Sequence, residues 1–263
     1  MFCNMWFAYI FAGIGAGVVT GLAGLSAAVV ITPVLVSICR WDSYNAVTVA
    51  LAADVLASLL SAYTYSKNKN IDLKNGLLVT ITAFIGSVIG SYSGYLFSQA
   101  QPDGLGYLSM ITTIFLGIKF LWKPITKGAD ASEGKKMMSA KKTALAMFLG
   151  CGIGWVCGFT GSGGGVLMLT VFTMVLGYNL KVAVGTSTMI MTMVALSGAC
   201  SHVLMGARAE ILPAGLTVLS CLIGAYVSAG FANKCEIRKL NRVVGVVLTI
   251  LGLVTIIMKL FQA

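Results

Sequence analysis

Two glycine-rich segments, each inside a long run without charged side chains, contain the residues of this chain best suited to ligand chemistry. Residues 158–165 read Gly-Phe-Thr-Gly-Ser-Gly-Gly-Gly, and residues 21–26 read Gly-Leu-Ala-Gly-Leu-Ser. Glycine permits positive φ and close backbone approach, and exposed N–H groups at a helix start can hold an anion. We therefore predict an oxyanion site built from Thr160, Gly161, Ser162, Gly163, Gly164 and Gly165, with Gly24, Leu25 and Ser26 from the first segment.

Close helix crossing is the alternative role for these glycines, because small residues let membrane helices approach one another. Five glycines in eight residues exceed what such packing needs, so we favour the binding role. Gly185, Thr186, Ser187 and Thr188 follow near the start of the next predicted helix. We expect Thr186 and Ser187 to form a second wall of the site, although hydroxyls in helices also often donate to their own backbone carbonyls.

Asp54 is the only acidic residue well inside a predicted membrane span. Carboxylates are costly in a membrane and usually functional, so Asp54 is the candidate for binding a coupling proton or sodium ion. The alternative is a buried carboxyl group that hydrogen-bonds a nearby hydroxyl, such as that of Ser58 or Thr48.

His202, Arg40 and Arg208 are the other ionisable residues of interest. The sole histidine, His202, lies near the end of a span, where we expect it to pack at the membrane interface. Arg40 and Arg208 could steer anions. Because each is followed two residues later by an acid, local pairing is the simpler expectation.

The predicted spans contain no Ser-His-Asp set, no paired carboxylates and no cluster of metal ligands. We therefore expect no enzymatic activity, no cofactor and no metal site.

The composition indicates a helical protein of the cell membrane with several spans. Its 263 residues are 58% hydrophobic and 10% charged, whereas soluble domains carry roughly 25% charged residues. Long apolar runs such as residues 75–102 can cross a bilayer, which takes about 20 helical residues. The net charge of +10 comes from basic residues between the runs. These residues indicate topology and contacts with anionic lipid rather than nucleic-acid binding.

The two halves of the chain match at a spacing of 137 residues, where Gly21, Gly24 and Trp41 fall on Gly158, Gly161 and Tyr178. A later shift of one residue brings Ile85-Gly86 onto Ile223-Gly224. We predict a first membrane repeat at residues 1–122, a basic cytoplasmic linker at 123–142 and a second repeat at 143–263. The predicted helices cover residues 5–20, 27–38, 43–66, 73–98, 104–122, 142–157, 166–176, 180–205, 211–232 and 240–260.

The positive charges favour five helical segments per repeat. With the linker in the cytoplasm, this count keeps Lys67, Lys69, Lys74, Lys181 and the basic residues 234–242 inside, as the positive-inside rule requires. An odd number of segments makes the repeats inverted. The expected fold is an all-α polytopic membrane protein with two inverted repeats. Each has a glycine-broken helical hairpin followed by three transmembrane helices, and hydropathy alone would report about eight spans.

These motifs resemble the TauE/SafE sulfite exporter family, also called the 4-toluene sulfonate uptake permease family. The resemblance covers nearly the whole chain and rests on residues 158–165 followed by Ala183-Val184-Gly185-Thr186-Ser187, with a weaker echo in Gly21-Leu-Ala-Gly24 and Pro33-Val34-Leu35. The family usually has a glycine triplet and a later proline in both repeats. Here Ser26-Ala27-Ala28 replaces the first triplet and Thr170 the second proline.

The resemblance implies transport of sulfur-containing anions such as sulfite, thiosulfate or organosulfonates. Together with the residues, it favours a secondary transporter in which one repeat rocks against the other around an anion bound at the glycine-rich breaks. The partners would be the small anionic substrate, the lipid bilayer and a coupling proton or sodium ion. An anion-selective channel of the same architecture is the alternative function.

Overall fold

The computed structural model describes residues 2–122, 140–161, 164–178 and 180–232, with positions 245, 246, 249, 250, 253 and 257. The regular structure of these residues is entirely helical. In chain order the elements are α1 (Phe2–Ala23), α2 (Ala28–Ser37), α3 (Ser43–Lys67), α4 (Leu73–Ala100), α5 (Gly104–Trp122), α6 (Ala140–Thr160), α7 (Gly164–Thr170), the π-helix η1 (Val171–Val175), α8 (Leu180–Leu204) and α9 (Ile211–Ala232).

The helices predicted between residues 5 and 232 are all present, and their ends differ by three residues or fewer when α7 and η1 are taken together. The predicted linker at 123–142 lies outside the described residues except for 140–142, which begin α6. Most of the predicted helix at 240–260 also lies outside them.

Five of the helices are long and apolar enough to cross a membrane, and they lie in α3, α4, α6, α8 and α9. Shorter apolar helices cover Trp6–Leu22, Ala28–Ser37 and Gly104–Phe115. Large apolar side chains such as Phe7, Phe115 and Phe148 are exposed, as side chains that face lipid would be. The prediction of a multi-pass helical membrane protein is confirmed.

Helices α3 and α8 pack side by side in opposite directions. Near the start of α3, Asn45 Oδ1 accepts the backbone N–H of Arg208, which lies beyond the end of α8, at 2.8 Å. Beyond the end of α3, the backbone N–H of Asp72 donates to Thr186 Oγ1 near the start of α8, at 3.0 Å. Because each helix has 25 residues, the pair spans about 37 Å, enough to cross the hydrocarbon core.

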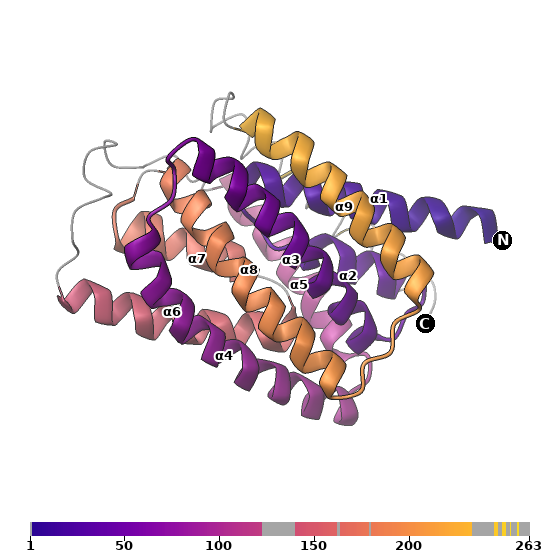
Figure 1. The fold of residues 1–263 in the computed structure, drawn as a ribbon. Helices are drawn as coiled ribbons and strands as arrows, with labels where there is room; N and C mark the ends of the chain where they lie inside the picture. The colour runs from indigo at the N-terminus through magenta and orange to yellow at the C-terminus, as the bar shows by residue number, and fades with distance from the viewer. Residues whose placement is uncertain are drawn as a thin grey trace.

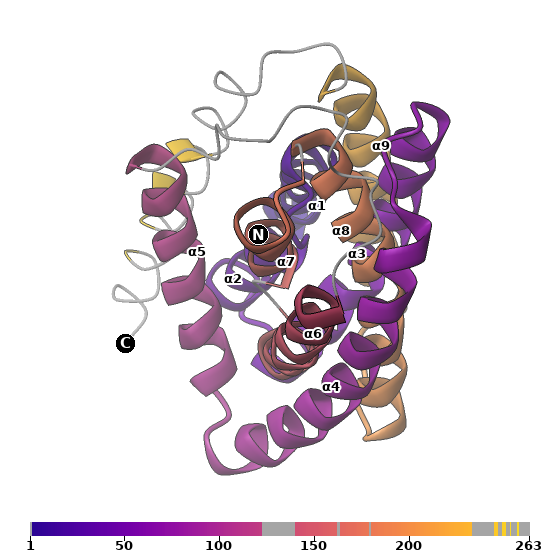
Figure 2. The ribbon, with the colours of Figure 1, turned by 90° about the vertical axis from the view of Figure 1, so that its left-hand side faces the viewer.

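Glycines let two further helix pairs approach closely. Helix α1 runs along α9 (Figure 1), where a Cβ on Gly17 would clash with the carbonyl oxygen of Cys221. Helix α4 runs along α6, where a Cβ on Gly90 would clash with the carbonyl oxygen of Trp155. The pairing is reciprocal, since the first helix of each half contacts the fourth helix of the other. The short helices α2 and α7 lie near the middle of the bundle (Figure 2).

The turns of the first half recur in the second half at the spacing seen in the sequence. In the described residues, positive φ occurs in pairs separated by 137 positions: Gly24 with Gly161, Arg40 with Gly177 and Lys69 with Gly206. Backbone hydrogen bonds recur in the same way. Trp41 N–H donates to Leu35 O at 3.0 Å, and Tyr178 N–H donates to Phe172 O at 2.9 Å.

The contact between α4 and α6 gives a test of the fold. A Cβ on Gly154 would lie 2.7 Å from the carbonyl carbon of Ala83, whereas a Cβ on Gly152, on the same helix, meets nothing within 4 Å. We expect Gly154→Ala to lower the free energy of unfolding by about 1–3 kcal/mol, as overpacking does. The matched Gly152→Ala should be neutral or stabilising by up to about 1 kcal/mol because alanine favours helix. Unfolding in detergent measures both, and equal stabilities would contradict the packing.

Candidate functional site

In both glycine-rich segments a helix ends before a glycine in the left-handed backbone conformation. Helix α1 ends at Ala23 and Gly24 has φ +66, while α6 ends at Thr160 and Gly161 has φ +67. The N–H of Gly24 donates to Thr20 O at 2.8 Å in the last turn of α1. The N–H of Gly161 likewise donates to Cys157 O at 2.7 Å in the last turn of α6. The predicted site residues Ser162 and Gly163 lie outside the described residues.

The two breaks contact each other although they are far apart in the sequence. The Ser26 hydroxyl lies 3.2 Å from the carbonyl oxygen of Gly161. A Cβ on Gly165 would clash with Gly24 O and would lie 3.0 Å from both Leu25 Cα and Ser26 N. Glycine at position 165 therefore allows the start of α7 to rest against the first break.

Helix α8 adds a third wall beside this contact. A Cβ on Gly24 would lie 3.0 Å from Val184 Cγ1 and 3.4 Å from Ser187 Oγ. The Ser187 hydroxyl donates to Val184 O at 3.0 Å, within its own helix. The structure thus brings Ser187 to the breaks, with its proton directed to the backbone.

The other two predicted hydroxyls have partners away from the break. Thr160 Oγ1 donates to Val156 O at 2.9 Å, within α6. Thr186 Oγ1 accepts the backbone N–H of Asp72, so this side chain packs against the start of α4. To contact an anion, Thr160 would have to release Val156 O, whereas Thr186 acts here as an acceptor and could donate its own proton.

Asp54 connects α3 to the start of α2. Its Oδ2 accepts the Ser26 hydroxyl at 2.6 Å, and its Oδ1 accepts the backbone N–H of Ala27 at 2.9 Å. The side chain is fully buried. The hydroxyl partners expected from the sequence were Ser58 and Thr48. Instead, Ser58 donates to the backbone carbonyl of Asp54, and Thr48 contacts His202.

The second break lacks this carboxylate. The spacing of 137 residues puts Met191 at the position that corresponds to Asp54. Met191 lies at the second break, where its Sδ would be 3.1 Å from a Cβ on Gly164. The start of α2 therefore faces a carboxylate, whereas the start of α7 faces an uncharged thioether. Sequence reasoning missed Met191, although the repeat spacing contained the signal.

His202, predicted to pack at the membrane interface, lies in the last turn of α8 and is fully buried inside the bundle. Its Nδ1 lies 3.3 Å from Thr48 Oγ1, and its Nε2 lies 3.2 Å from Gly158 O. The ring stacks on Tyr44 with centroids 4.4 Å apart. The imidazole therefore joins α3 and α8 to α6 one turn before the second break.

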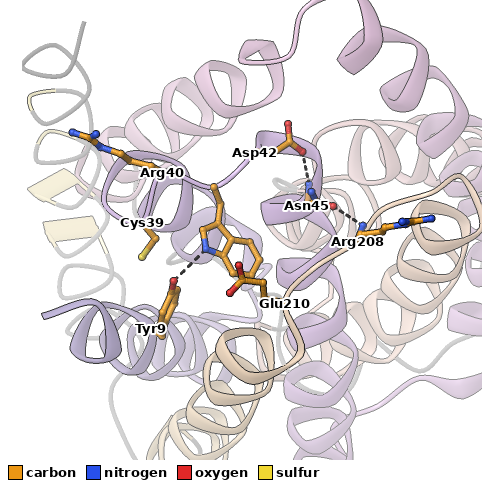
Figure 3. Close-up of a pocket in the computed structure, with 8 residues that line it drawn as sticks. Tyr9, Cys39, Arg40, Asp42, Asn45, Arg208 and Glu210 are labelled. Carbon is orange, nitrogen blue, oxygen red and sulfur yellow. Dashed lines mark hydrogen bonds between the residues drawn. The ribbon is translucent and has the colours of Figure 1, made fainter. Parts of the chain in front are cut away.

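A pocket of about 390 Å³ opens at the end of the bundle where α3 begins. Arg40 and Arg208 approach it from two different turns, and Asn45 joins these turns by accepting the backbone N–H of Arg208 (Figure 3). In the described part of the chain, neither guanidinium forms an ion pair, so the expected local pairing with Asp42 and Glu210 is not observed.

Comparison with known proteins identifies relatives along nearly the whole chain. The profile of the sulfite exporter TauE/SafE family matches residues 9–255. The probable membrane transporter protein YunE of Bacillus subtilis is 26% identical over 255 residues, which cover 91% of this chain and 93% of YunE. The probable membrane transporter protein MJ0441 of Methanocaldococcus jannaschii is 23% identical over 236 residues, which cover 87% of this chain and 84% of the relative. No solved structure matches.

The capping role of Asp54 can be tested by substitution. Asp54→Ala leaves the Ala27 N–H and the Ser26 hydroxyl without their acceptor, so we expect it to lower the free energy of unfolding by about 1–3 kcal/mol for each group. Asp54→Asn keeps one acceptor oxygen and should cost less. Unfolding in detergent provides the comparison. An alanine variant as stable as the parent would rule out the cap.

Proposed function

Because the chain belongs to the sulfite exporter TauE/SafE family, we propose that it is a secondary transporter of a small sulfur-containing oxyanion. Sulfite, thiosulfate and organosulfonates are the candidates. The chain is a multi-pass membrane protein of a transporter family rather than an enzyme, and its relatives YunE and YdhB of Bacillus subtilis are described as probable membrane transporters. That the substrate contains sulfur is inferred from the family description alone. That it is an anion is inferred both from the family and from the residues of the breaks.

We infer that residues 1–122 and 143–263 are inverted repeats joined by the linker at 123–142. The recurrence of the turns at 137 residues supports the repeat. The antiparallel packing of α3 and α8 supports the inversion, because these helices correspond under the same spacing. Inverted repeats commonly form transport sites where their broken helices meet, and rocking of one repeat alternates access.

The anion binds at the second break in this proposal. The observation that carries it is the difference between Asp54 and Met191. The positive end of α2 already has a carboxylate partner, whereas no carboxylate of the described residues contacts that of α7. Backbone N–H groups at Gly164 and Gly165, together with the predicted contacts of Gly161, Ser162 and Gly163, would hold the oxyanion. Thr160 and Ser187 would donate their hydroxyl protons after releasing backbone carbonyls, and Thr186 would donate the proton that its bond from Asp72 N–H does not use.

Asp54 gives this site a route to ion coupling. A proton or a sodium ion at Asp54 would neutralise the carboxylate that lies next to the second break through Ser26 and Gly161. The anion would then meet less repulsion, so each ion would bind better in the presence of the other. This reciprocity is the basis for coupled movement.

Substitution of Met191 tests the site. Met191→Asp would introduce a tethered carboxylate at the second break, where it would compete with the substrate, so we expect uptake into proteoliposomes to be abolished. Met191→Asn introduces a side chain of nearly the same shape as aspartate but without its charge, so this variant should retain measurable uptake. Both variants should first be shown to insert and to unfold at similar temperatures. Equal uptake by the two would refute the site, as would full uptake by Gly164→Leu.

A ligand panel tests the substrate class. We expect one of sulfite, thiosulfate, sulfoacetate or taurine to raise the unfolding temperature, and simple carboxylates to do so less. Ligand at 100 times its Kd stabilises by about 2.7 kcal/mol. The ligand that binds should also drive counterflow in proteoliposomes, whereas saturable binding without counterflow would favour the channel.

A further inference from the structure

Equivalent residues close one end of the α3–α8 pair and leave the other end open. Tyr178, before α8, corresponds to Trp41, before α3, by the spacing of 137 and by the matching hydrogen bonds of their backbone N–H groups. Asp72 and Glu210 also correspond, since each immediately precedes the fourth helix of its half. The carbonyl oxygens of both accept a backbone N–H four residues later, at 3.1 Å.

At the end where α3 finishes, these residues make a buried latch of Tyr178, Asp72 and Asn75. Tyr178 Oη donates to Asp72 Oδ2 at 2.7 Å. Asn75 Nδ2 donates to Asp72 Oδ2 at 2.7 Å and lies 3.1 Å from Tyr178 Oη. Burial and the hydrogen bond to Asp72 raise the pKa of Tyr178, so the phenol keeps its proton and remains the donor. All three side chains are buried.

The latch joins the two halves of the chain at one end. Tyr178 belongs to the second half, and Asp72 and Asn75 belong to the first. The backbone N–H of Asp72 also donates to Thr186 in the second half. Lys67, Lys69 and Lys74 lie beside this end in the sequence, and we name it the lysine end.

At the opposite end, named the arginine end after Arg40 and Arg208, the corresponding pair does not close. Trp41 Nε1 donates to Tyr9 Oη at 3.2 Å instead of to Glu210. Trp41 and Glu210 both line the pocket of about 390 Å³, in which Figure 3 labels Glu210. A second pocket of about 450 Å³ lies beside it and reaches Tyr44, whose ring stacks on His202.

We propose that Tyr178 with Asp72 and Trp41 with Glu210 are the two gates of the transport pathway, with the first closed and the second open in this structure. The proposal rests on the transport function inferred above. During transport the Tyr178–Asp72 hydrogen bond breaks as the lysine end opens, and Trp41 leaves Tyr9 to close on Glu210. Only one gate closes at a time, so the breaks face one side of the membrane in each state.

Side-specific labelling tests the gates without relying on transport. Ser187→Cys puts a thiol beside the breaks, and peptide mapping by mass spectrometry separates it from the native cysteines. Because Ser187 is fully buried, labelling by a membrane-impermeant thiol reagent should be slow, and in sealed vesicles of either orientation it should come from the arginine end only. Adding Tyr178→Phe keeps the ring and removes the donor. Labelling from the lysine end should then rise roughly tenfold, as expected for loss of a hydrogen bond to a charged acceptor.

A matched control removes a different hydroxyl at the same end. Tyr65 is buried there, with its Cβ 2.9 Å from where a Cβ on Gly185 would lie. Tyr65→Phe in the Ser187→Cys background should leave labelling from the lysine end unchanged. An equal increase in both phenylalanine variants, or no increase in Tyr178→Phe, would overturn the proposal.

A second variant builds the latch at the open end. Trp41→Tyr combined with Glu210→Asp supplies the donor and the shorter carboxylate found at the lysine end. We expect labelling of Ser187→Cys from the arginine end to fall at least severalfold, and unchanged labelling would count against the gates. Because labelling needs no substrate, its result is independent of the transport assay. The gates can be disproved while sulfur oxyanions are still transported, and they can be supported even if none of the tested anions is transported.

Discussion

A broken helix inside a membrane must find partners for its free backbone groups, because no water is available there to replace them. This constraint accounts for the centre of the molecule. At the first break, Asp54 accepts the Ala27 N–H and the Ser26 hydroxyl. The second break rests against the first through Gly165 and the Ser26–Gly161 contact. Each break is thus sheltered from lipid by protein, and neither half could provide this shelter alone.

Close packing at the periphery holds the two breaks together. The glycine contacts between α1 and α9 and between α4 and α6 each join one half of the chain to the other. The central α3–α8 pair does the same through Asn45, Ser58 and Asp72, with hydrogen bonds near its two ends and at its middle. Because each of these contacts joins one half to the other, rocking of the halves must change some of them, while the helices within each half can pivot at the turns. Those turns contain the positive-φ residues.

Local sequence patterns predicted the helices, because the position of a helix depends on the length of an apolar run and on the turn residues next to it. The repeat spacing likewise predicted that Gly24 and Gly161 are equivalent, and both are left-handed. Tertiary partners were harder to predict. Asp54 was identified as unusual, but its bond to Ser26 depends on how α2 folds back against α3. His202 was expected at the interface because it is near a helix end, and only the packing of Tyr44 and Gly158 around it explains its burial.

The differences between the halves matter more for function than their likeness. Two identical halves would present the same charge at both breaks and the same closure at both ends, so nothing would favour one state over the other. Here Asp54 corresponds to Met191, and the donor and acceptor Tyr178 and Asp72 correspond to Trp41 and Glu210. The first difference puts a carboxylate at the start of α2 and an uncharged thioether at the start of α7, where we propose that the anion binds. The second would give the two proposed gates closures of unequal strength, because a buried phenol–carboxylate hydrogen bond is stronger than a contact to an exposed glutamate. If the halves are repeats that rock as proposed, these differences would give the molecule a preferred direction of opening.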